Sequence, residues 1–202
     1  MPKHKTTEDS GLESLRQDIQ FTQTMSGHDF RFKSTWGIFS PKQIDAGTLL
    51  LMKYIKIQPN ADCFDLGCGY GPIGIALAKM APQGETLMVD KDFMAVEYAN
   101  KNTTLNHVSN ATAMLSNGFD HIDKAKRFDV IVSNVPAKVG KEMLSLIFHD
   151  AEQHLKPGGE IYLVTINGLR QYIKRNLKLT FGNYKKIKQG ANYTISYAQK
   201  ER

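Results

Sequence analysis

The part of the chain best suited to chemistry is a glycine-rich turn that follows a short apolar segment. It reads Asp65-Leu66-Gly67-Cys68-Gly69-Tyr70-Gly71-Pro72-Ile73-Gly74. Gly67, Gly69 and Gly71 allow the backbone to turn tightly and let a ligand approach where a Cβ atom would clash. Pro72 suits the first turn of a helix, because the N–H group that proline lacks has no partner there. The pattern predicts a strand, a cofactor-binding loop and a helix.

Asp65, two residues before the first glycine, distinguishes between two cofactors. The spacing Gly69-x-Gly71-x-x-Gly74 also satisfies the dinucleotide fingerprint, which is a weak pattern when it stands alone. A carboxylate at the strand end would repel a pyrophosphate, whereas it can accept hydrogen bonds from a cationic amino-acid group. S-adenosylmethionine (AdoMet) carries such an ammonium group and NAD carries two phosphates. The sequence therefore favours AdoMet.

Two more polar residues end the next strand-like segments. Asp90 closes Leu87-Met88-Val89-Asp90, where a carboxylate can bind both ribose hydroxyls, and Asp92 is better placed to cap the following helix. Asn117 follows the third segment, and its amide can accept from the adenine amino group and donate to a ring nitrogen. Asn117-Gly118 is also a turn-forming pair, so both roles stay open for Asn117.

The fourth segment ends in Ser133-Asn134-Val135-Pro136-Ala137-Lys138. A polar Asn134 that closes an apolar strand, with Pro136 two residues later, is more than a loop requires. Asn134 therefore adds a hydrogen-bonding amide to the ligand edge of the sheet, and Lys138 adds a positive charge beside it.

These positions need elements that bring them to one edge of a sheet. Strand-like runs at 63–66, 86–90, 111–115, 128–133 and 161–165 alternate with helical patterns at 72–80, 93–106, 140–155 and 169–177. Such alternation predicts parallel strands with right-handed crossovers, hence a doubly wound Rossmann-like α/β sheet. Runs at 184–188 and 193–198 leave no room for a helix and predict a C-terminal antiparallel hairpin, for seven strands in all. Ligands bind such sheets at the carboxyl ends of the strands.

The composition indicates one folded domain without a membrane segment. The chain has 202 residues, 41% hydrophobic and 23% charged. Residues 1–28 are polar and without a sustained period, so we expect an N-terminal tail followed by a domain at 29–202. The apolar runs are too short to cross a bilayer, and Cys63 and Cys68 lack the further ligands of a zinc site. We expect a cytoplasmic protein with reduced thiols and neither a metal nor a membrane partner.

Basic residues concentrate at one end of the chain. The net charge is +6, and residues 167–202 hold nine basic residues and one acid. A basic face fits a polyanionic partner such as RNA, although a solvated helix face is the commoner cause of such a pattern. Four histidines lie away from the strand ends, and we expect them on the solvated surface: His107, His121, His149 and His154.

In combination, these motifs resemble the class I AdoMet-dependent methyltransferases of the "methyltransferase small" family, which includes ribosomal RNA guanine-N2 methyltransferases. The resemblance runs from about Phe30 to the C-terminus and includes a lead-in, Gly37-Ile38-Phe39-Ser40 and Ile44-Asp45-x-Gly47-Thr48. In this family the loop after the fourth strand usually reads Asn-Pro-Pro and then an aromatic or other apolar residue. Here Val135 replaces the first proline and Ala137 stands at the fourth position. The resemblance implies that Asn134 Oδ1 and the carbonyl of Val135 or Pro136 accept the two hydrogens of an exocyclic amine and stabilise the charge that develops on it. We therefore predict Asn134 and Pro136 as catalytic residues and Val135 and Lys138 as substrate contacts. No strong base is required, because the proton can leave to solvent. The resemblance also implies that Phe39 or Trp36 lies near the active site, where it could contact the substrate by stacking.

The resemblance implies an AdoMet-dependent N-methyltransferase that modifies guanine N2 of ribosomal RNA, and the basic C-terminal segment favours RNA as the substrate. A protein glutamine-amide methyltransferase uses a similar grip on its substrate and remains the alternative. A methyltransferase-like binding protein remains open as well, because of the departures at Val135 and Ala137. A dinucleotide oxidoreductase is disfavoured by Asp65. The sequence leaves the oligomeric state and the target nucleotide undetermined.

Overall fold

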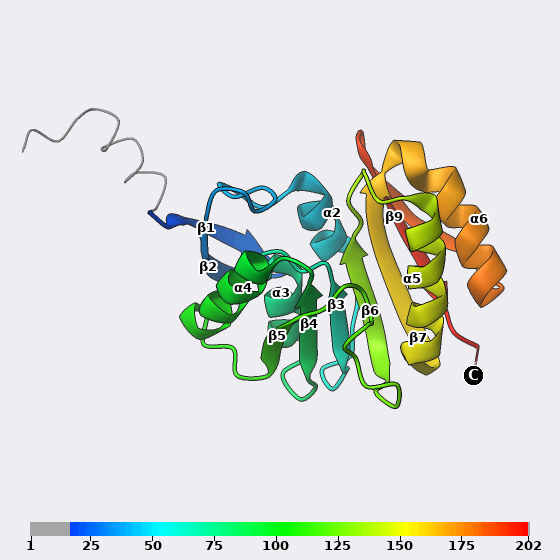
Figure 1. The fold of residues 1–202 in the computed structure, drawn as a ribbon, viewed down its shortest axis with the longest axis horizontal. Coiled ribbons are helices and arrows are strands. Elements are labelled where there is room, and N and C mark those ends of the chain that lie inside the picture. The colour runs from blue at the N-terminus through cyan, green and yellow to red at the C-terminus, as the bar shows by residue number, and fades with distance from the viewer. Residues whose placement is uncertain (1–16, 202) are drawn as a thin grey trace, which may run out of the picture.

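A computed structural model describes residues 17–201, and its centre is a seven-stranded sheet (Figure 1). The strand order is β5-β4-β3-β6-β7-β9-β8. These strands are β3 (Cys63–Leu66), β4 (Thr86–Asp90), β5 (Ala111–Leu115), β6 (Phe128–Asn134), β7 (Leu155–Ile166), β8 (Lys185–Gln189) and β9 (Tyr193–Gln199). The helices are α2 (Ala46–Tyr54), α3 (Pro72–Met80), α4 (Phe93–Leu105), α5 (Lys141–His154) and α6 (Arg170–Phe181), with a 3-10 turn η1 (Asn167–Leu169).

The pairing of the strands confirms the predicted fold class. Strands β3 to β7 run parallel, while β9 pairs antiparallel with both β7 and β8. The chain builds outward from β3 to β5 and then returns to the other side of β3 as β6. This reversal is the switch point where doubly wound sheets bind their ligands.

Alternate side chains of the strands face two separate layers of core. On β6, Val130 and Val132 pack into the layer that includes Leu51 of α2, Ile75 of α3 and other residues of the same face. Ile131 points the other way, into the layer that includes residues of α5 and α6. Because the central strands are covered on both faces, they read as nearly continuous apolar runs, which is the pattern from which they were predicted.

Two elements extend further than the sequence predicts. Strand β7 begins at Leu155, which pairs with Phe128, and the register then shifts before Val130 pairs with Glu160. The irregular stretch holds Gly159, where an added Cβ would lie 2.9 Å from the Lys156 carbonyl oxygen. Helix α6 continues to Phe181, and Gly182, with a φ of 72°, ends it in the left-handed conformation.

The predicted tail at 1–28 is wrong in its last third. Strand β1 (Ile19–Met25) pairs antiparallel with β2 (His28–Ser34) through a two-residue turn at Ser26 and Gly27. The ring of Phe21 packs 5.7 Å from that of Phe32 and 6.0 Å from that of Tyr70, measured between ring centroids. Only one face of β1 is apolar, and Gln23 interrupts that face, which hides its period. Residues 1–16 of the predicted tail lie outside the described part of the chain.

Helix α4 holds this hairpin through two side-chain amides that pair with the backbone of β2 as a neighbouring strand would. The side-chain amide of Asn102 accepts from Lys33 N at 2.8 Å and donates to Lys33 O at 2.8 Å. Asn106 does the same with Arg31, at 2.9 Å and 2.7 Å. Four residues of helix rise about 6 Å and two residues of strand about 6.8 Å, so the two amides match alternate backbone positions of β2.

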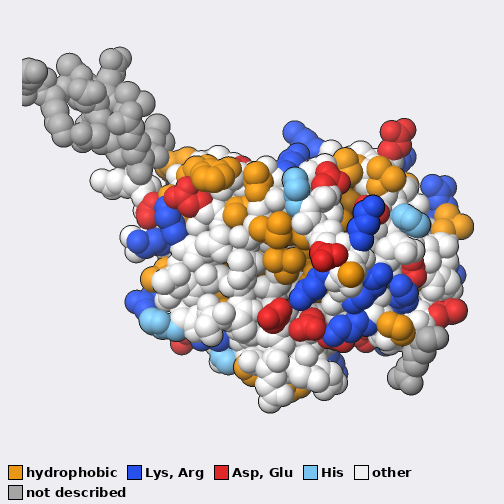
Figure 2. Space-filling view, turned by 60° about the horizontal axis from the view of Figure 1, so that its bottom comes forward, with side chains coloured by type: hydrophobic (Ala, Val, Ile, Leu, Met, Phe, Trp, Pro, Cys, Tyr) orange, Lys and Arg blue, Asp and Glu red, His pale blue; other side chains and the backbone are white. Residues whose placement is uncertain are grey.

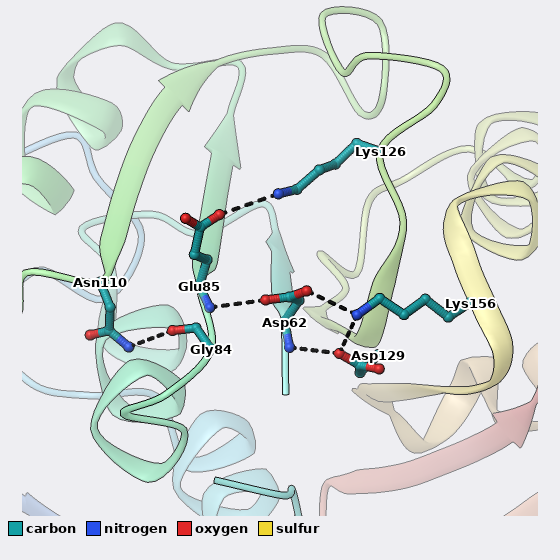
Figure 3. Close-up of polar contacts among 7 residues, drawn as sticks. All are labelled: Asp62, Gly84, Glu85, Asn110, Lys126, Asp129 and Lys156. Atoms are coloured by element: carbon teal, nitrogen blue, oxygen red, sulfur yellow. Dashed lines mark hydrogen bonds and ion pairs between the residues drawn. The ribbon is translucent and has the colours of Figure 1, made fainter. Parts of the chain in front are cut away.

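A network of charged side chains ties together the amino ends of the strands (Figure 3). Lys156 Nζ donates to Asp62 Oδ2 at 2.9 Å and to Asp129 Oδ2 at 2.8 Å. Asp62 also accepts from Glu85 N at 3.1 Å, and its own N–H donates to Asp129 at 2.8 Å. Figure 2 shows the face of the molecule at this end, with Lys and Arg side chains interleaved with Asp and Glu. Between residues 17 and 201, no helix is long and apolar enough to span a membrane.

Candidate active site

The polar residues predicted from the strand ends converge on one edge of the sheet. Asp65 in β3 is level with Met88 in β4 and Val132 in β6, while Asp90 is level with Leu115 at the end of β5. The ends of β3, β4, β5 and β6 therefore meet at the carboxyl edge, at the top of the sheet in Figure 1. The opposite edge carries the charged network described above.

The glycine loop after β3 has the geometry that its sequence predicts. Gly67, Gly69 and Gly71 have φ angles of 74°, 55° and 92°, in the left-handed region. A Cβ added at Gly67 or Gly69 would meet no atom within 4 Å, so the loop borders open space. Gly74 has the opposite role, because an added Cβ would lie 2.3 Å from Met88 Cγ. This contact packs α3 closely against β4.

Asp65 is a fully buried carboxylate that is only half satisfied. Its Oδ2 accepts from Gly74 N at 2.8 Å, and its Oδ1 has no hydrogen-bond partner among residues 17–201. Burial raises the pKa of Asp65 to about 7, the hydrogen bond from Gly74 opposes that rise, and the nearby charge of Asp90 adds to it. A buried carboxyl group without a cation is thus held at the base of the glycine loop.

Asp90 connects the end of β4 to the glycine loop. Its Oδ2 accepts from Gly69 N at 2.9 Å, and its Oδ1 accepts from Asp92 N at 3.0 Å. Each carboxylate oxygen has a second acceptor site that remains for a ligand. Asp92 caps α4, as predicted, by accepting from Met94 N at 2.8 Å.

At the end of β5 the structure favours the turn interpretation of Asn117. Its side chain is exposed, and Nδ2 donates to Asp120 at 3.3 Å within a turn where Gly118 has a φ of 64°. Two apolar residues that sequence reasoning missed lie on either side of this edge. Leu115 is 46% exposed and Phe93, at the start of α4, is 65% exposed. Their signal was an apolar residue at a strand end and another at the first turn of a helix, where solvated residues are usual.

Asn134 is held by the beginning of α2. Its Nδ2 donates to Asp45 Oδ2 at 2.9 Å and to Thr48 Oγ1 at 3.0 Å. Asp45 caps α2 by accepting from Gly47 N and Thr48 N, and its Oδ1 accepts from the Tyr193 hydroxyl at 2.9 Å. The sequence motif Asp45-x-Gly47-Thr48 signalled the lead-in but not this contact, and nothing in the sequence signalled Tyr193.

The loop after β6 presents only some of its predicted residues. Pro136 and Lys138 are exposed at the edge, whereas Val135 is buried and its N–H donates to Val164 O at 3.0 Å. The Val135 side chain packs in the apolar core, so the substrate contact that we predict at this residue is left to its carbonyl group. The Pro136 carbonyl accepts from Val139 N at 3.2 Å in a turn.

The lead-in segment lies against the glycine loop. The Tyr70 hydroxyl is 3.3 Å from both the Ser40 and Gln43 carbonyl oxygens, to which it donates. This contact holds the segment that carries Phe39, which is 69% exposed. Phe39 is thus an uncovered aromatic side chain on a loop that is joined to the predicted cofactor site.

One of the four histidines differs from expectation. His154, the last residue of α5, is buried, and its ring stacks on Phe119 with centroids 4.9 Å apart. Its Nδ1 lies 3.0 Å from the Lys126 carbonyl oxygen. The ring fills the core instead of facing solvent, since one nitrogen is satisfied by backbone. Both Cys63 and Cys68 are buried free thiols.

Comparison with known proteins identifies the family. The model of the methyltransferase small domain matches residues 29–197. The uncharacterized protein YbxB of Bacillus subtilis (strain 168) is 34% identical over 165 residues, which cover 81% of each chain. Ribosomal RNA small subunit methyltransferase C of Hamiltonella defensa is 33% identical over 174 residues, 84% of this chain and 50% of that protein.

Among solved structures, the 16S rRNA N2 methyltransferase RsmC of T. thermophilus, in complex with AdoMet and guanosine, superposes with a TM-score of 0.83. It is 28% identical, and the match covers 91% of this chain and 51% of that one. The chain thus spans about half the length of the ribosomal RNA methyltransferases that it resembles. With a family match over most of its length and a relative of similar size, this chain belongs to the methyltransferase small domain family.

Proposed function

We propose that the chain is an AdoMet-dependent N-methyltransferase that modifies the exocyclic N2 amine of guanine in ribosomal RNA. The observation that carries the proposal is the amide of Asn134, whose nitrogen is engaged and whose oxygen is left as an acceptor at the same edge as the glycine loop. The similarity to a guanosine-bound rRNA N2 methyltransferase supports guanine as the acceptor base. Such a substrate implies work in the cytoplasm, where ribosomes are assembled.

The residues at the glycine loop fit AdoMet, which supplies an electrophilic methyl group on a sulfonium. Asp65 Oδ1 is a buried acceptor without a partner in the part of the chain that the structure describes, and it suits the ammonium group of the amino-acid portion. Because Asp65 is fully buried, that group reaches Oδ1 only when the glycine loop moves or through a water molecule. Asp90 would bind the ribose hydroxyls, while Leu115 and Phe93 offer apolar surface to adenine and Asn117 offers an amide beside it.

Asn134 would act on the amine that receives the methyl group. The nitrogen lone pair of an exocyclic amine is delocalised into the ring, which makes the amine a poor nucleophile. Asn134 Oδ1 and the Val135 carbonyl can accept its two hydrogens, which favours a tetrahedral nitrogen and stabilises the positive charge that grows during transfer. The Pro136 carbonyl is already engaged by Val139 N, so Pro136 would act by shaping the loop. The released proton leaves to solvent.

The surface beside this loop suits a polyanion. Lys138 follows Asn134, and Lys141 begins α5, where the Tyr172 hydroxyl of α6 donates to the Lys141 carbonyl. This contact brings the basic helix α6 next to the loop, with the Arg175 guanidinium 5.7 Å from the Tyr172 ring. Lysines of the edge strand β8 add exposed charge. The basic segment of the sequence is therefore divided between a helix next to the site and a sheet edge.

The test is transfer of labelled methyl from AdoMet to total RNA and to total protein from cells that lack the chain. We expect label in ribosomal RNA, recovered as N2-methylguanosine after digestion, and no label with Asn134→Ala. Label in protein as methylglutamine would replace the RNA proposal with the protein alternative. AdoMet binding without transfer to either fraction would make the chain a binding protein.

A further inference from the structure

We infer that Asp45 and Tyr193 are positioning residues that fix the amide of Asn134 with its oxygen toward the methyl acceptor. The inference rests on the proposed function and deepens it, because it assigns a supporting role to a residue that contacts Asn134 and to one that contacts it through Asp45. They come from the beginning of α2 and the beginning of β9, while Asn134 ends β6.

The orientation of the Asn134 amide follows from the chemistry of its partners. The two hydrogens on Nδ2 are directed to Asp45 Oδ2, at 2.9 Å, and to Thr48 Oγ1, at 3.0 Å. An ionised carboxylate only accepts hydrogen bonds, so the nitrogen and not the oxygen must face Asp45. The planar amide then directs Oδ1 away from α2, and no hydrogen bond to Oδ1 is formed within residues 17–201.

Asp45 is itself held on both oxygens. Oδ2 accepts from Gly47 N at 2.9 Å and from Thr48 N at 3.3 Å, and Oδ1 accepts from the Tyr193 hydroxyl at 2.9 Å. The Tyr193 ring lies directly over Gly47, where an added Cβ would be 2.9 Å from the ring carbon Cδ1. The glycine therefore makes room for the tyrosine, and the carboxylate has little freedom to rotate.

The same contacts strengthen Asn134 Oδ1 as an acceptor. A carboxylate that accepts from an amide N–H polarises the amide and increases the negative charge on its oxygen, as in other chains of hydrogen bonds. Burial raises the pKa of Tyr193, and the hydrogen bond to Asp45 raises it further, so the hydroxyl stays a donor. Tyr193, Asp45 and Asn134 form one chain that ends where positive charge develops.

Asp45→Asn is the sharpest test, because asparagine caps helices as well as aspartate does. The oxygen that accepts from Gly47 N and Asn134 Nδ2 is kept, while the charge is lost and the acceptor that faces Tyr193 becomes a donor. We expect kcat for methyl transfer to guanine in RNA to fall about tenfold or more while KM for AdoMet stays within about twofold. Tyr193→Phe, which keeps the ring over Gly47, should lower kcat by about threefold to tenfold. Unchanged kcat in Asp45→Asn would overturn the inference and leave the proposed function intact.

Two matched variants control for effects on folding. Asp123→Asn alters an exposed carboxylate that accepts from Ala125 N at 2.8 Å, the same local contact as that between Asp45 and Gly47. Tyr184→Phe removes a hydroxyl from a tyrosine packed against the other core layer. Both controls should keep the kcat of the wild type. A comparable loss of kcat in either control would overturn the assignment to Asp45 and Tyr193.

A readout independent of catalysis separates this inference from the proposed function. The side-chain amide protons of Asn134, assigned in NMR spectra by their loss in Asn134→Ala, should shift in Asp45→Asn, because one donates to the carboxylate. Unshifted resonances would overturn the inference. A shift in a protein that methylates no RNA would support the fixed amide and overturn only the proposed function.

Discussion

Asp65 carries a cost in the ligand-free protein that a neutral residue would not. Its folded-state pKa of about 7 lies above the ordinary value of 3.8, so the folded chain favours the protonated form. Protonation of Asp65 therefore contributes to the free energy of unfolding. This contribution is fully present below pH 3.8, and it is lost as the pH rises through about 7. At neutral pH and above, Asp65 therefore lowers the stability of the ligand-free fold, which is typical of residues that bind a ligand.

Asp65→Asn should separate stability from binding. The amide can still accept from Gly74 N but carries no charge, so the melting temperature without AdoMet should exceed that of the wild type at pH 8, by on the order of 5 °C. At pH 5 the two proteins should melt close together. Affinity for AdoMet, measured by calorimetry, should fall roughly tenfold to a hundredfold through loss of a charge-assisted hydrogen bond. A variant that is destabilised more at pH 8 than at pH 5 would contradict this account.

Asn134 should respond differently to its two simplest substitutions. Asn134→Ala removes the acceptor and should lower turnover by about a hundredfold or more, with little change in AdoMet affinity. Asn134→Asp places a carboxylate next to Asp45, where the present nitrogen to oxygen distance is 2.9 Å. Repulsion between the like charges should displace the loop, so this variant should be no more active than alanine. Single-turnover assays at saturating AdoMet measure both.

The sequence predicts the residues at strand ends better than the residues that support them. The place of Asp65, Asp90 and Asn134 at the carboxyl edge was predictable, because a polar residue that closes an apolar strand has few purely structural reasons to be there; their roles toward ligands stay predictions. Tyr193 was not predictable, since it contacts Asp45 across 148 residues of sequence. The burial of the Val135 side chain was not predictable, because the sequence does not show which way a side chain points after a strand ends.

At the scale of elements, several boundaries were predicted to the residue where an apolar run ends beside glycine, proline or a capping residue, although the end of α6 before Gly182 was not. Strands β3, β4 and β5 and helix α3 begin and end at the predicted residues. Strand β1 was missed because a hairpin with one exposed face carries a weak alternation, although Ser26 and Gly27 form a recognisable turn. The early part of β7 was missed because Gly158 and Gly159 interrupt its pattern.

The lysines of strand β8 lead to a prediction about the affinity of the chain for RNA. It is an edge strand with three lysines, Lys185, Lys186 and Lys188, of which Lys188 Nζ lies 5.6 Å from the Tyr54 ring. Replacing all three by glutamine should weaken RNA binding and reduce the slope of log affinity against log salt by about one unit per lost phosphate contact. AdoMet affinity should not change. Lys124→Gln, in an exposed loop, is the control. An unaltered slope in the triple variant would mean that the three lysines do not contact RNA and instead keep the exposed edge strand from pairing with other chains.

At the scale of the whole molecule, the two edges of the sheet have different electrostatic roles. The carboxyl edge leaves Asp65 Oδ1 unpaired, while the amino edge pairs Lys156 with Asp62 and Asp129. Burial raises the pKa of Asp62, but the hydrogen bonds from Lys156 and Glu85 N outweigh it and hold that pKa below 3.8. Stability from this carboxylate is present above pH 3.8 and is lost as the pH falls through the folded-state value.

Lys156→Met should therefore destabilise the chain at neutral pH and much less in acid. The side chains of Lys156, Asp62 and Asp129 are 37%, 30% and 38% exposed, so solvent screens the pairs. We expect a loss on the order of 1 kcal/mol in the free energy of unfolding at pH 7. Urea titrations at pH 7 and pH 3 should show the difference between wild type and variant shrinking. A difference that is independent of pH would attribute the loss to packing of the lysine stem.

Asn102 and Asn106 of α4 connect two backbone amides of β2 to the helix that begins beside the predicted cofactor site, so hydrogen exchange at these amides can report on that site. The N–H groups of Arg31 and Lys33 donate to Asn106 and Asn102, so their exchange with deuterium requires α4 to leave the hairpin. Helix α4 begins three residues after Asp90, which we propose as the ribose ligand. A ligand that holds Asp90 should therefore slow isotope uptake at these two amides of β2, which hydrogen-deuterium exchange measured with and without AdoMet would detect.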